Sequence, residues 1–501
     1  MTLQPVLAAT TLEVVTQLVY MASALCFVLG IKKLTKVKTA KAGNRMASLA
    51  MLVAIAMTVF LVVFDADLTA ALPWMLGGLV VGGGIGAFLA KKVEMTEMPE
   101  LVAFFNGMGG ASSMFVALST AAFAGAKLGE TTLSAPQTPE VAAGLGEFAK
   151  LLETGPDFAL SIGLSILIGA VTLSGSLIAY MKLANKLWKK RLGPIGSKPL
   201  NIAMFVGALA LVTYGGFLST GGATGYVFIG LAVLALVLGV GLTVPIGGAD
   251  MPVVISLLNS YSGLAAAMTG FLLKNNLLVV AGMLVGAAGL ILTQIMCKAM
   301  NRSLVNVLFA DYGDDGGGGG DTEYTNVTST TAEELAPLLE AAEKVIIVPG
   351  YGLAVAQAQH KCRELGDLLE KDGIEVAYAI HPVAGRMPGH MNVLLAEADV
   401  EHEKLFDLDQ INSEFKNAEI AIVLGANDVC NPDAYDDPTG PIGGMPVLDV
   451  WDAQTVIVIK RSLSAGYAGI KNPLFDKDNT LMYFSDAKKA LEDMVTEYQD
   501  L

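Results

Sequence analysis

Charged side chains are scarce in this sequence. They make up 16% of its 501 residues, whereas hydrophobic side chains make up 53%. A soluble protein of this size is about one quarter charged. The deficit lies in the part of the chain before about residue 300, which is a series of long apolar runs, while the remainder has an ordinary mixed composition. The sequence therefore predicts two regions, one embedded in a bilayer and one in water.

An excess of basic residues and closely spaced cysteines are also lacking, and no cleavable leader is expected. The net charge of −15 argues against a nucleic-acid partner, because phosphate binding needs clustered lysine and arginine. Cys26, Cys297, Cys362 and Cys430 have no C-x-x-C spacing, which favours a reducing compartment and no metal site. The N-terminus has neither a basic signal-peptide start nor an arginine-rich transit character. The first apolar run is therefore expected to be retained, and a bacterial inner membrane is the simplest location.

Nine apolar runs are candidates to cross a hydrocarbon core about 30 Å thick. The predicted spans are 6–29, 46–64, 72–90, 101–126, 158–181, 202–220, 226–244, 251–273 and 277–296. Together they predict a polytopic α-helical membrane domain over residues 1–300.

The charges of the connections alternate along this domain. The basic stretches are 32–45, 91–92 and 186–198, and the acidic connections between them are 65–67 and 130–153. The positive-inside rule places the basic loops in the cytoplasm and the N-terminus outside. Nine crossings from there bring the C-terminal region to the cytoplasm.

Small residues are frequent in several spans, and the third span has the most glycines. These are Gly77, Gly78, Gly82, Gly83, Gly84 and Gly86. Small residues let helix backbones approach closely in a bilayer, where no hydrophobic force drives association. Close helix packing is the favoured interpretation, and a specific functional role for the glycines is the alternative.

The segment DDGGGGGD at 314–321 predicts a flexible, charged linker within 301–321, followed by one domain over 322–501. In that domain, short β-rich runs alternate with helical patterns. The expected strands are 344–348, 374–380, 420–424, 455–459 and 481–484, and the expected helices are 353–371, 391–398, 408–415 and 486–498. This alternation predicts a soluble α/β Rossmann-like domain with a parallel sheet covered on both faces.

The segment VIIVPGYGLAVAQAQ at 345–359 is the sharpest local motif. A buried strand leads through Gly350, Tyr351 and Gly352 directly into a helix. Glycines suit this corner because the chain turns tightly and a pyrophosphate can approach the backbone at a helix N-terminus. The third motif position is Val355 rather than glycine or alanine. A tight turn without a ligand is the alternative, but the α/β context favours dinucleotide binding.

The ends of two other strands favour NADP over NAD. An NAD-type fold has an acidic residue about 20 residues further on that binds the ribose hydroxyl. The strand 374–380 ends instead in HPVAG at 381–385, without an acid, and the strand 455–459 ends in KRS at 460–462. Two cations and a hydroxyl suit a 2′-phosphate, although a solvated basic strand end is the alternative. Because these cations occur late in the sheet, the cofactor is expected to lie reversed relative to the usual Rossmann direction.

Asp428 is a further candidate, because it follows another strand in the motif GAND at 425–428. Ligands of an open parallel sheet lie beyond the carboxyl ends of the strands. A turn-capping role for Asp428 is equally open. No Ser-His-Asp, Cys-His or metal cluster is found in the sequence, and hydride transfer needs none because the cofactor carries the chemistry.

Polar residues inside the membrane region are candidates for a hydrated path, because burying them in a bilayer is costly. Asp250 precedes the eighth predicted span and Asn259 lies more than two turns deeper, while Asn106 and Ser176 lie in other spans. All four histidines belong to the soluble region, so this chain offers no intramembrane imidazole relay. For each residue taken singly, a hydrogen-bonded packing role is the alternative.

The motifs of both regions together resemble a known family. They are KVEMTEMPE (92–100), GADMPV (248–253), LNSYSG (258–263), MCKAMNR (296–302), GYG (350–352), HPVAGR (381–386), PGHMN (388–392), GAND (425–428), KRS (460–462) and GYAG (466–469). The sequence resembles the β subunit of proton-translocating NAD(P) transhydrogenase over most of its length.

This resemblance implies a proton-pumping transhydrogenase in which hydride passes from NADH on a separate α subunit to NADP on this chain. Protons moving inward across the membrane would drive NADPH formation. It also implies an α subunit with additional transmembrane helices, a dimer of the αβ unit and contact with membrane lipid. A transporter or channel gated by a nucleotide-binding domain is the alternative, in which NADP would be only a ligand.

The resemblance further implies roles for individual residues. The 2′-phosphate would be held by the KRS residues, Tyr467 would cover the cofactor, and Asp428 would lie near the nicotinamide and take part in proton coupling. The candidate cofactor-binding residues are Gly350, Tyr351, Gly352, Val355, Ala384, Gly385, Arg386, Gly425, Asn427, Asp428, Lys460, Arg461, Ser462 and Tyr467. The candidate catalytic residues are Asp428 and His381, and the candidate proton-path residues are Asp250, Asn259, Asn106 and Ser176. Some relatives have a membrane histidine at the position of Asn106, so the resemblance leaves the proton relay open.

Overall fold

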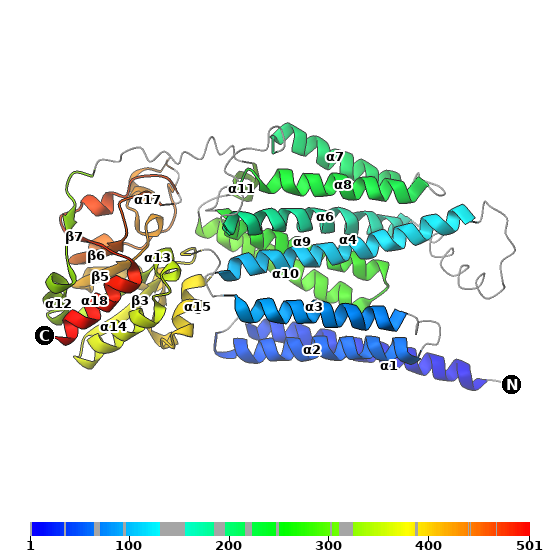
Figure 1. The fold of residues 1–501 in the computed structure, drawn as a ribbon, viewed down its shortest axis with the longest axis horizontal. Helices are drawn as coiled ribbons and strands as arrows, with labels where there is room; N and C mark the ends of the chain where they lie inside the picture. The colour runs from blue at the N-terminus through cyan, green and yellow to red at the C-terminus, as the bar shows by residue number, and fades with distance from the viewer. Residues whose placement is uncertain are drawn as a thin grey trace.

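The computed structural model of the chain describes residues 3–34, 37–64, 71–93, 97–130, 156–184, 196–215, 223–246, 250–300, 303–309, 324–385, 389–438, 440, 442–466 and 468–501. Apolar helices make up the part before residue 310, and a parallel sheet with helices makes up the part from residue 324 onwards (Figure 1). The predicted linker at 314–321 lies outside the described residues.

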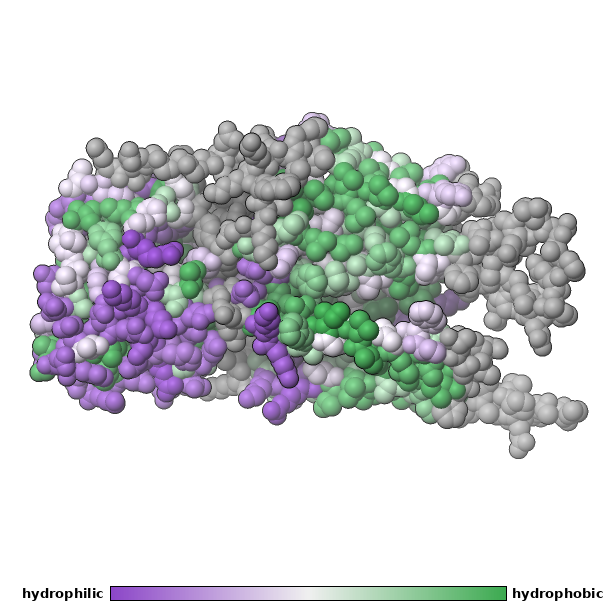
Figure 2. Space-filling view, in the orientation of Figure 1, coloured by the Kyte–Doolittle hydropathy of each residue, from purple (hydrophilic) through white to green (hydrophobic). Residues whose placement is uncertain are grey.

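Long helices form the first part of the chain. They are α1 (Leu3–Leu34), α2 (Val37–Phe64), α3 (Leu72–Lys92), α4 (Met98–Glu130), α6 (Pro156–Leu183), α7 (Lys198–Thr213), α8 (Ala223–Thr243), α9 (Met251–Leu272) and α10 (Asn276–Ala299), followed by the short α11 (Leu304–Phe309). Within the described ranges, eight of these helices are long and apolar enough to span a bilayer. A helix satisfies its own backbone hydrogen bonds, so its apolar side chains can face lipid. Figure 2 shows hydrophobic side chains over these helices and mainly hydrophilic ones over the sheet region.

The sixth predicted span differs from the others. It corresponds to α7, which has 16 residues and is shorter than the eight spanning helices. The end that the sequence predicts for this span, residue 220, lies outside the described residues.

The interior of the helical part forms where α4, α6, α9 and α10 pack together through small residues. A methyl group on Gly110 of α4 would lie 2.6 Å from the Gly169 carbonyl oxygen of α6, and one on Gly263 of α9 would overlap the Gly286 backbone nitrogen of α10. Glycine at these positions lets the backbones touch, as expected for bilayer helices. Close packing through small residues is therefore observed at these two helix pairs.

Helix α3 does not follow that pattern, which corrects the packing interpretation of its glycines. A methyl group on any of its six glycines would meet no atom within 4 Å among the described residues, and α3 has no buried residue there. Composition alone suggested close contact. Among the described residues the glycine-rich surface of α3 is open, and the main contact of α3 is with α2.

The second part is a seven-stranded, entirely parallel sheet. Its strands are β1 (Thr328–Ser329), β2 (Lys344–Pro349), β3 (Glu375–Ile380), β4 (Leu405–Asp407), β5 (Ile420–Leu424), β6 (Thr455–Lys460) and β7 (Thr480–Phe484), in the order β1-β7-β6-β5-β2-β3-β4. From β4 to β7, this order is that of the doubly wound dinucleotide-binding fold, with β2 as its first strand. The predicted Rossmann-like fold is confirmed.

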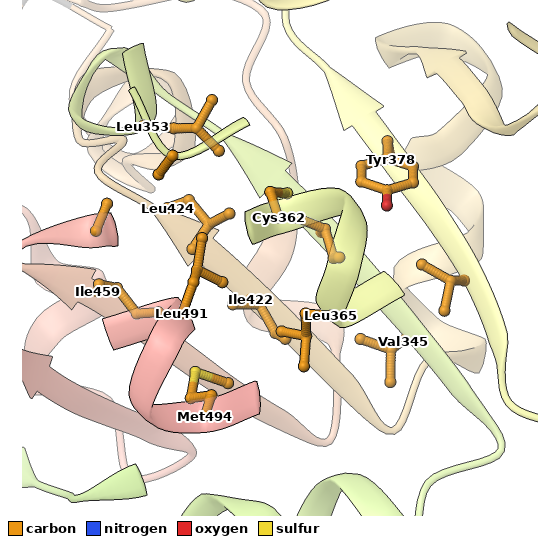
Figure 3. Close-up of a cluster of buried hydrophobic side chains, with 14 of the residues drawn as sticks. Val345, Leu353, Cys362, Leu365, Tyr378, Ile422, Leu424, Ile459, Leu491 and Met494 are labelled. Atoms are coloured by element: carbon orange, nitrogen blue, oxygen red, sulfur yellow. The ribbon is translucent and has the colours of Figure 1, made fainter. Parts of the chain in front are cut away.

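Both faces of this sheet are buried, as a parallel sheet requires. Val345 and Ile347 belong to the core on one face, whereas Ile346 and Val348 belong to the core on the other. Figure 3 shows the first core, where Cys362 and Leu365 of α14 (Gln359–Lys371) and side chains of α18 (Ala487–Gln499) lie over the strands. These cores contain only residues of the sheet region, so this region has a hydrophobic interior of its own.

The remaining helices refine the expected pattern. They are α12 (Ala332–Glu340), α13 (Tyr351–Val355), α15 (His390–Glu397), α16 (Leu408–Ile411) and α17 (Asp433–Asp436), with 3₁₀ turns η5 (His402–Lys404), η6 (Asn412–Asn417), η7 (Asp428–Cys430), η8 (Val450–Asp452) and η9 (Pro473–Asp476). The five predicted strands are confirmed, whereas β1, β4 and α12 were not predicted. The single helix expected over 353–371 is wrong: the chain breaks between α13 and α14, where Gln357 has a φ of 50°. The helix expected over 408–415 is α16 continued by the 3₁₀ turn η6.

Replacing Gly263 by alanine should destabilise the helical part by about 1–3 kcal/mol, because the added methyl group overpacks the α9–α10 contact. The matched change Gly78→Ala in α3 should be neutral or stabilising, since its glycine faces open space and alanine is the better helix former. Thermal unfolding of the detergent-solubilised protein measures both. Equal destabilisation by the two changes would contradict the packing described here.

Candidate nucleotide-binding site

The crevice that the strand order creates lies between β2 and β5. After β2 the chain continues to β3 on one side, whereas after β5 it continues to β6 on the other, so their following loops diverge at the carboxyl edge of the sheet. Ligands of open parallel sheets bind at such a switch point. The loops there are 350–352 and 425–428, both of which the sequence predicts as site segments.

Three glycines bring these loops into direct backbone contact. Gly350 N–H donates to the Leu424 carbonyl and Gly352 N–H to the Gly425 carbonyl, both at 2.9 Å. A side chain at Gly350 would overlap Ala426, and Gly425 has a left-handed φ of 65° with no room for one. The glycines therefore permit the contact between the two loops. Beside them, Tyr351 is half-buried against the core and Val355 is exposed.

Asp428 lies beneath the loop that follows β6. Its Oδ2 atom accepts a hydrogen bond from the Ala468 N–H at 3.0 Å. A side chain at Gly466 would overlap the Asp428 carboxylate, so glycine there lets the loop approach it closely. The loop after β6 thus folds back onto the loop after β5 and holds this carboxylate by a backbone amide.

Lys460, at the end of β6, is the cation nearest to this carboxylate loop. Its Nζ donates to the Ser464 carbonyl at 2.8 Å and lies 4.7 Å from the centre of the Phe475 ring. Burial lowers the pKa of Lys460, and the charge of Asp428 acts in the opposite direction. Arg461 and Ser462 follow on the exposed surface, where the Ser462 hydroxyl lies 2.9 Å from that of Ser464.

Asn427 joins these groups. With its amide oriented so that the oxygen faces donors, that oxygen accepts from the Gly466 N–H at 2.6 Å and from Lys460 Nζ at 3.1 Å. The Asn427 backbone carbonyl accepts from the Asn472 side chain at 3.1 Å. The structure therefore brings Asn427, Asp428 and Lys460 together, as the sequence predicts for residues at neighbouring strand ends.

His381, directly after β3, is fixed by the backbone. Its Nε2 lies 2.7 Å from the Pro446 carbonyl, and its Nδ1 accepts from the Val383 N–H at 3.2 Å. These contacts place the hydrogen on Nε2 of a neutral ring. Burial lowers the pKa of His381 to about 4, against which the bond to Pro446 acts. His381 is thus a neutral link between the loop after β3 and the segment around Pro446.

The rest of the loop after β3 is tightly packed. Ala384 is buried, and Gly385 has a φ of 99° and lies against the His390 ring, so a side chain there would overlap it. Arg386 and Tyr467 lie outside the described residues.

The polar candidates of the membrane region lie on α4, on α6, on α9 and immediately before α9. The Asn106 side chain donates to the Ile255 carbonyl at 3.4 Å, and its backbone carbonyl accepts from the Ser262 hydroxyl at 2.8 Å. Asn259 lies between these two α9 contacts in sequence and is half-buried. Asp250, immediately before α9, is fully buried. Asn106 is therefore bonded to the helix that carries Asn259 and directly follows Asp250.

Ser176 is fully buried on α6, with its Cβ close to Gly107 of α4. Its hydroxyl has no hydrogen-bond partner among the described residues. Other buried hydroxyls were not singled out from the sequence, such as the pair Ser165 and Thr269 at 2.8 Å and the pair Thr293 and Ser256 at 3.1 Å. Single serines and threonines are common in membrane helices, so composition gives no signal that separates these pairs.

Comparison with known proteins assigns the chain to a family. The family model described as NAD(P) transhydrogenase beta subunit matches residues 16–497. The chain belongs to this family. The NAD(P) transhydrogenase subunit beta of Rhodospirillum rubrum is 47% identical over 489 residues, which cover 96% of this chain and 98% of that protein. A second Rhodospirillum rubrum sequence of the same name, from a specified strain, matches to the same extent.

Membership of the transhydrogenase β-subunit family agrees with both parts of the fold. It makes the chain a membrane protein, a component of a nicotinamide-nucleotide transhydrogenase and the partner of an α subunit. The resemblance inferred from the motifs is confirmed.

Several residues around the candidate nucleotide-binding site were not among the predicted site residues, although Gly466 and Ala468 belong to the motif GYAG. They are Ser464, Gly466, Ala468, Asn472 and Phe475. Asn472 also had a local signal: the asparagine of Asn472-Pro473, before two apolar residues, matches a helix-start pattern. Its side chain indeed accepts from the Leu474 N–H at the start of η9. That pattern predicts the turn but not the contact with Asn427.

The stability of the sheet domain should fall as pH decreases from 6.5 to about 4 in part because of His381. In this window the unfolded chain binds a proton at His381 that the folded domain does not, so protonation favours unfolding by about 1.4 kcal/mol per pH unit. His381→Gln should flatten this slope, whereas the matched change His360→Gln at an exposed position should leave it unaltered. Urea unfolding of residues 324–501 at several pH values measures it. An unchanged slope in His381→Gln would contradict the assignment.

Proposed function

We propose that this chain binds NADP(H) in the crevice formed by the loops after β2, β5 and β6, and exchanges hydride there with NAD(H) on the α subunit. The exchange is coupled to inward proton movement through the helical part, and NADPH is the product. The observation that carries the proposal is the group Lys460, Arg461 and Ser462 at the carboxyl end of β6, beside Asn427 and Asp428.

The charge distribution around the crevice supports NADP rather than NAD. In the doubly wound order, β3 is the strand whose end supplies the acid for a ribose hydroxyl. Here β3 ends at Ile380 and is followed by His381, and residues 381–385 include no acid. The cations stand on the opposite side of the crevice, at β6. This arrangement supports a cofactor that lies reversed relative to the usual Rossmann direction.

The donors at the end of β6 fit a phosphate. Arg461 offers a planar pair of N–H groups, and the Ser462 hydroxyl is exposed. Lys460 adds a positive charge, and burial disfavours this charge because it lowers the pKa of the side chain. A phosphate near Lys460 would stabilise the positive charge that burial disfavours. Lys460, Arg461 and Ser462 would hold the 2′-phosphate, and bound NADP supplies the hydride-accepting ring.

The chain's own residues orient the cofactor and sense its presence. The loop after β6 closes on the Asp428 carboxylate through Gly466 and Ala468. Any movement of this loop changes the hydrogen bonding of Asp428. We assign to Asp428 the link between cofactor binding and proton coupling, and to the neutral His381 the support of the loop after β3.

Proton movement is assigned to the polar side chains of α4, α6 and α9. Asn106, Ser176, Asn259 and Asp250 are the residues proposed for the path, and none of them is a histidine. Coupling follows if the redox state of the cofactor changes how the sheet domain docks on the helices, since a ligand shifts a conformational equilibrium only through different affinity for its two states. In the cell, we place the chain in a bacterial inner membrane, with the N-terminus outside, the sheet domain in the cytoplasm and two αβ units per assembly.

Lys460→Ala combined with Arg461→Ala should weaken NADP binding to residues 324–501 by about 100-fold or more. Each charge-assisted hydrogen bond contributes about 1.5–3 kcal/mol, and about 1.4 kcal/mol corresponds to a tenfold change in Kd. NAD binding should change little, because NAD lacks the phosphate. Isothermal titration with each nucleotide measures both affinities.

The matched control is the double change Lys488→Ala with Lys489→Ala, which removes two neighbouring exposed cations from α18. It alters net charge equally and should leave both affinities unaltered. Equal loss of NADP and NAD affinity in the first double variant would refute the phosphate assignment.

Transhydrogenation by the complex in sealed vesicles should respond to a proton gradient. With the α subunit present, reduction of NADP by NADH should accelerate when the gradient drives protons toward the side of the sheet domain, and an uncoupler should abolish the acceleration. Absorbance of NADPH together with a pH-sensitive dye measures both processes. A rate of NADP reduction that does not depend on the proton gradient would contradict the coupled mechanism.

A further inference from the structure

The first described residues after the connecting stretch 310–323 are bonded to a loop next to the candidate nucleotide site. The backbone N–H groups of Thr325 and Asn326 donate to the Asp476 carboxylate at 3.0 and 3.3 Å. The Asn326 side chain donates to Asp478 at 2.7 Å. Asp476 also pairs with Lys471. The segment that leads from the membrane helices is therefore attached to residues 471–478 before the first strand begins.

Tyr324 contacts the loop after β6 through both its hydroxyl and its ring. Its hydroxyl accepts a hydrogen bond from the Asn472 N–H at 3.2 Å. Its ring contacts two further groups, since the Phe475 ring centre lies 5.8 Å and Lys471 Nζ lies 4.7 Å from its own centre. One side chain thus contacts three successive parts of the loop after β6.

Two of these partners touch the candidate nucleotide-binding residues directly. Asn472 is fully buried, and its side chain donates to the backbone carbonyl of Asn427 at 3.1 Å. Phe475 is also fully buried, and the Lys460 ammonium lies 4.7 Å from its ring centre. Tyr324 is therefore connected to Asn427 through Asn472, and to Lys460 through Phe475.

We propose that Tyr324 is a positioning residue for the NADP-binding loops, through which the segment from the membrane helices acts on Asn427, Asp428 and Lys460. The inference rests on the proposed function, because it concerns the same site. Asn472 and Phe475 are held in a packed interior, so a displacement of Tyr324 cannot be absorbed by solvent-exposed side chains. It must instead break the bond to the buried Asn472 N–H or move the groups that contact Asn427 and Lys460.

The substitution that tests this is Tyr324→Phe, since it keeps the ring beside Lys471 and Phe475 and removes only the acceptor for Asn472 N–H. A matched control is Tyr483→Phe, because the Tyr483 hydroxyl also makes one half-buried hydrogen bond, to Asp493 at 3.0 Å, but on β7 facing α18. Both changes remove one tyrosine hydroxyl from the same domain. Only the first touches the contacts of Asn472.

In the full-length chain, Tyr324→Phe should raise the Kd for NADP about tenfold, the change expected when one hydrogen bond to a buried group is lost from the bound state. Tyr483→Phe should leave the Kd within about twofold of the unmodified protein. A purely structural role predicts instead that both variants lower the melting temperature and neither changes the Kd. That result would overturn the proposal.

The complex with the α subunit in sealed vesicles gives the second readout. Tyr324→Phe should retain NADPH formation without a gradient but lose most of its acceleration by an imposed proton gradient, whereas Tyr483→Phe should keep it. Full acceleration in Tyr324→Phe would also overturn the proposal. The unmodified complex tests the proposed function separately: if it shows no NADP preference or no response to the gradient, the proposed function fails and this inference fails with it.

Discussion

The backbone contact between Gly352 and Gly425 is the constraint on which the soluble domain's site depends. The Gly352 N–H donates to the Gly425 carbonyl, and a side chain at either residue would overlap the other loop. Because the loops after β2 and β5 are joined here, the chain after Gly425 leaves the sheet in one direction, toward the loop after β6. Asn427 and Asp428 then lie under Gly466 and Ala468. A nucleotide in this crevice would contact loops that already share hydrogen bonds, so its binding would affect the positions of all of these loops together.

In the helical part, buried polar groups have no water to bind and bond to neighbouring helices instead. Ser260 donates to the Gly286 carbonyl and Ser256 to the Gly289 carbonyl, so hydroxyls of α9 bond the exposed backbone of α10 where glycine leaves it bare. With backbones touching at Gly263 as well, α9 and α10 are expected to move as one unit. Asn259 belongs to α9 and Asp250 is the residue immediately before it, so a movement of that unit would carry both of them.

Much of the fold could be predicted because apolar runs as long as a strand or a membrane-spanning helix indicate which segments are buried. The five longer strands and the spanning helices have such runs, whereas β1 and β4 have two and three residues and carry no detectable alternation. The break between α13 and α14 depends on a left-handed Gln357, which helical periodicity does not reveal. The site segments could be predicted from strand ends. Their partners Asn472 and Phe475 could not, because only the return of the loop after β6 brings these residues to Asn427 and Lys460. The roles of the candidate residues, including Arg386 and Tyr467 outside the described residues, stay predictions.

The two strands that sequence reasoning missed also bound the sheet. β1 and β4 are its edges, and strands this short leave few backbone groups open to another molecule. A domain tethered to a bilayer meets its neighbours at far higher local concentration than a freely diffusing one. Blunt sheet edges would protect crowded copies from joining strand to strand, and so favour a membrane population that stays free of aggregates.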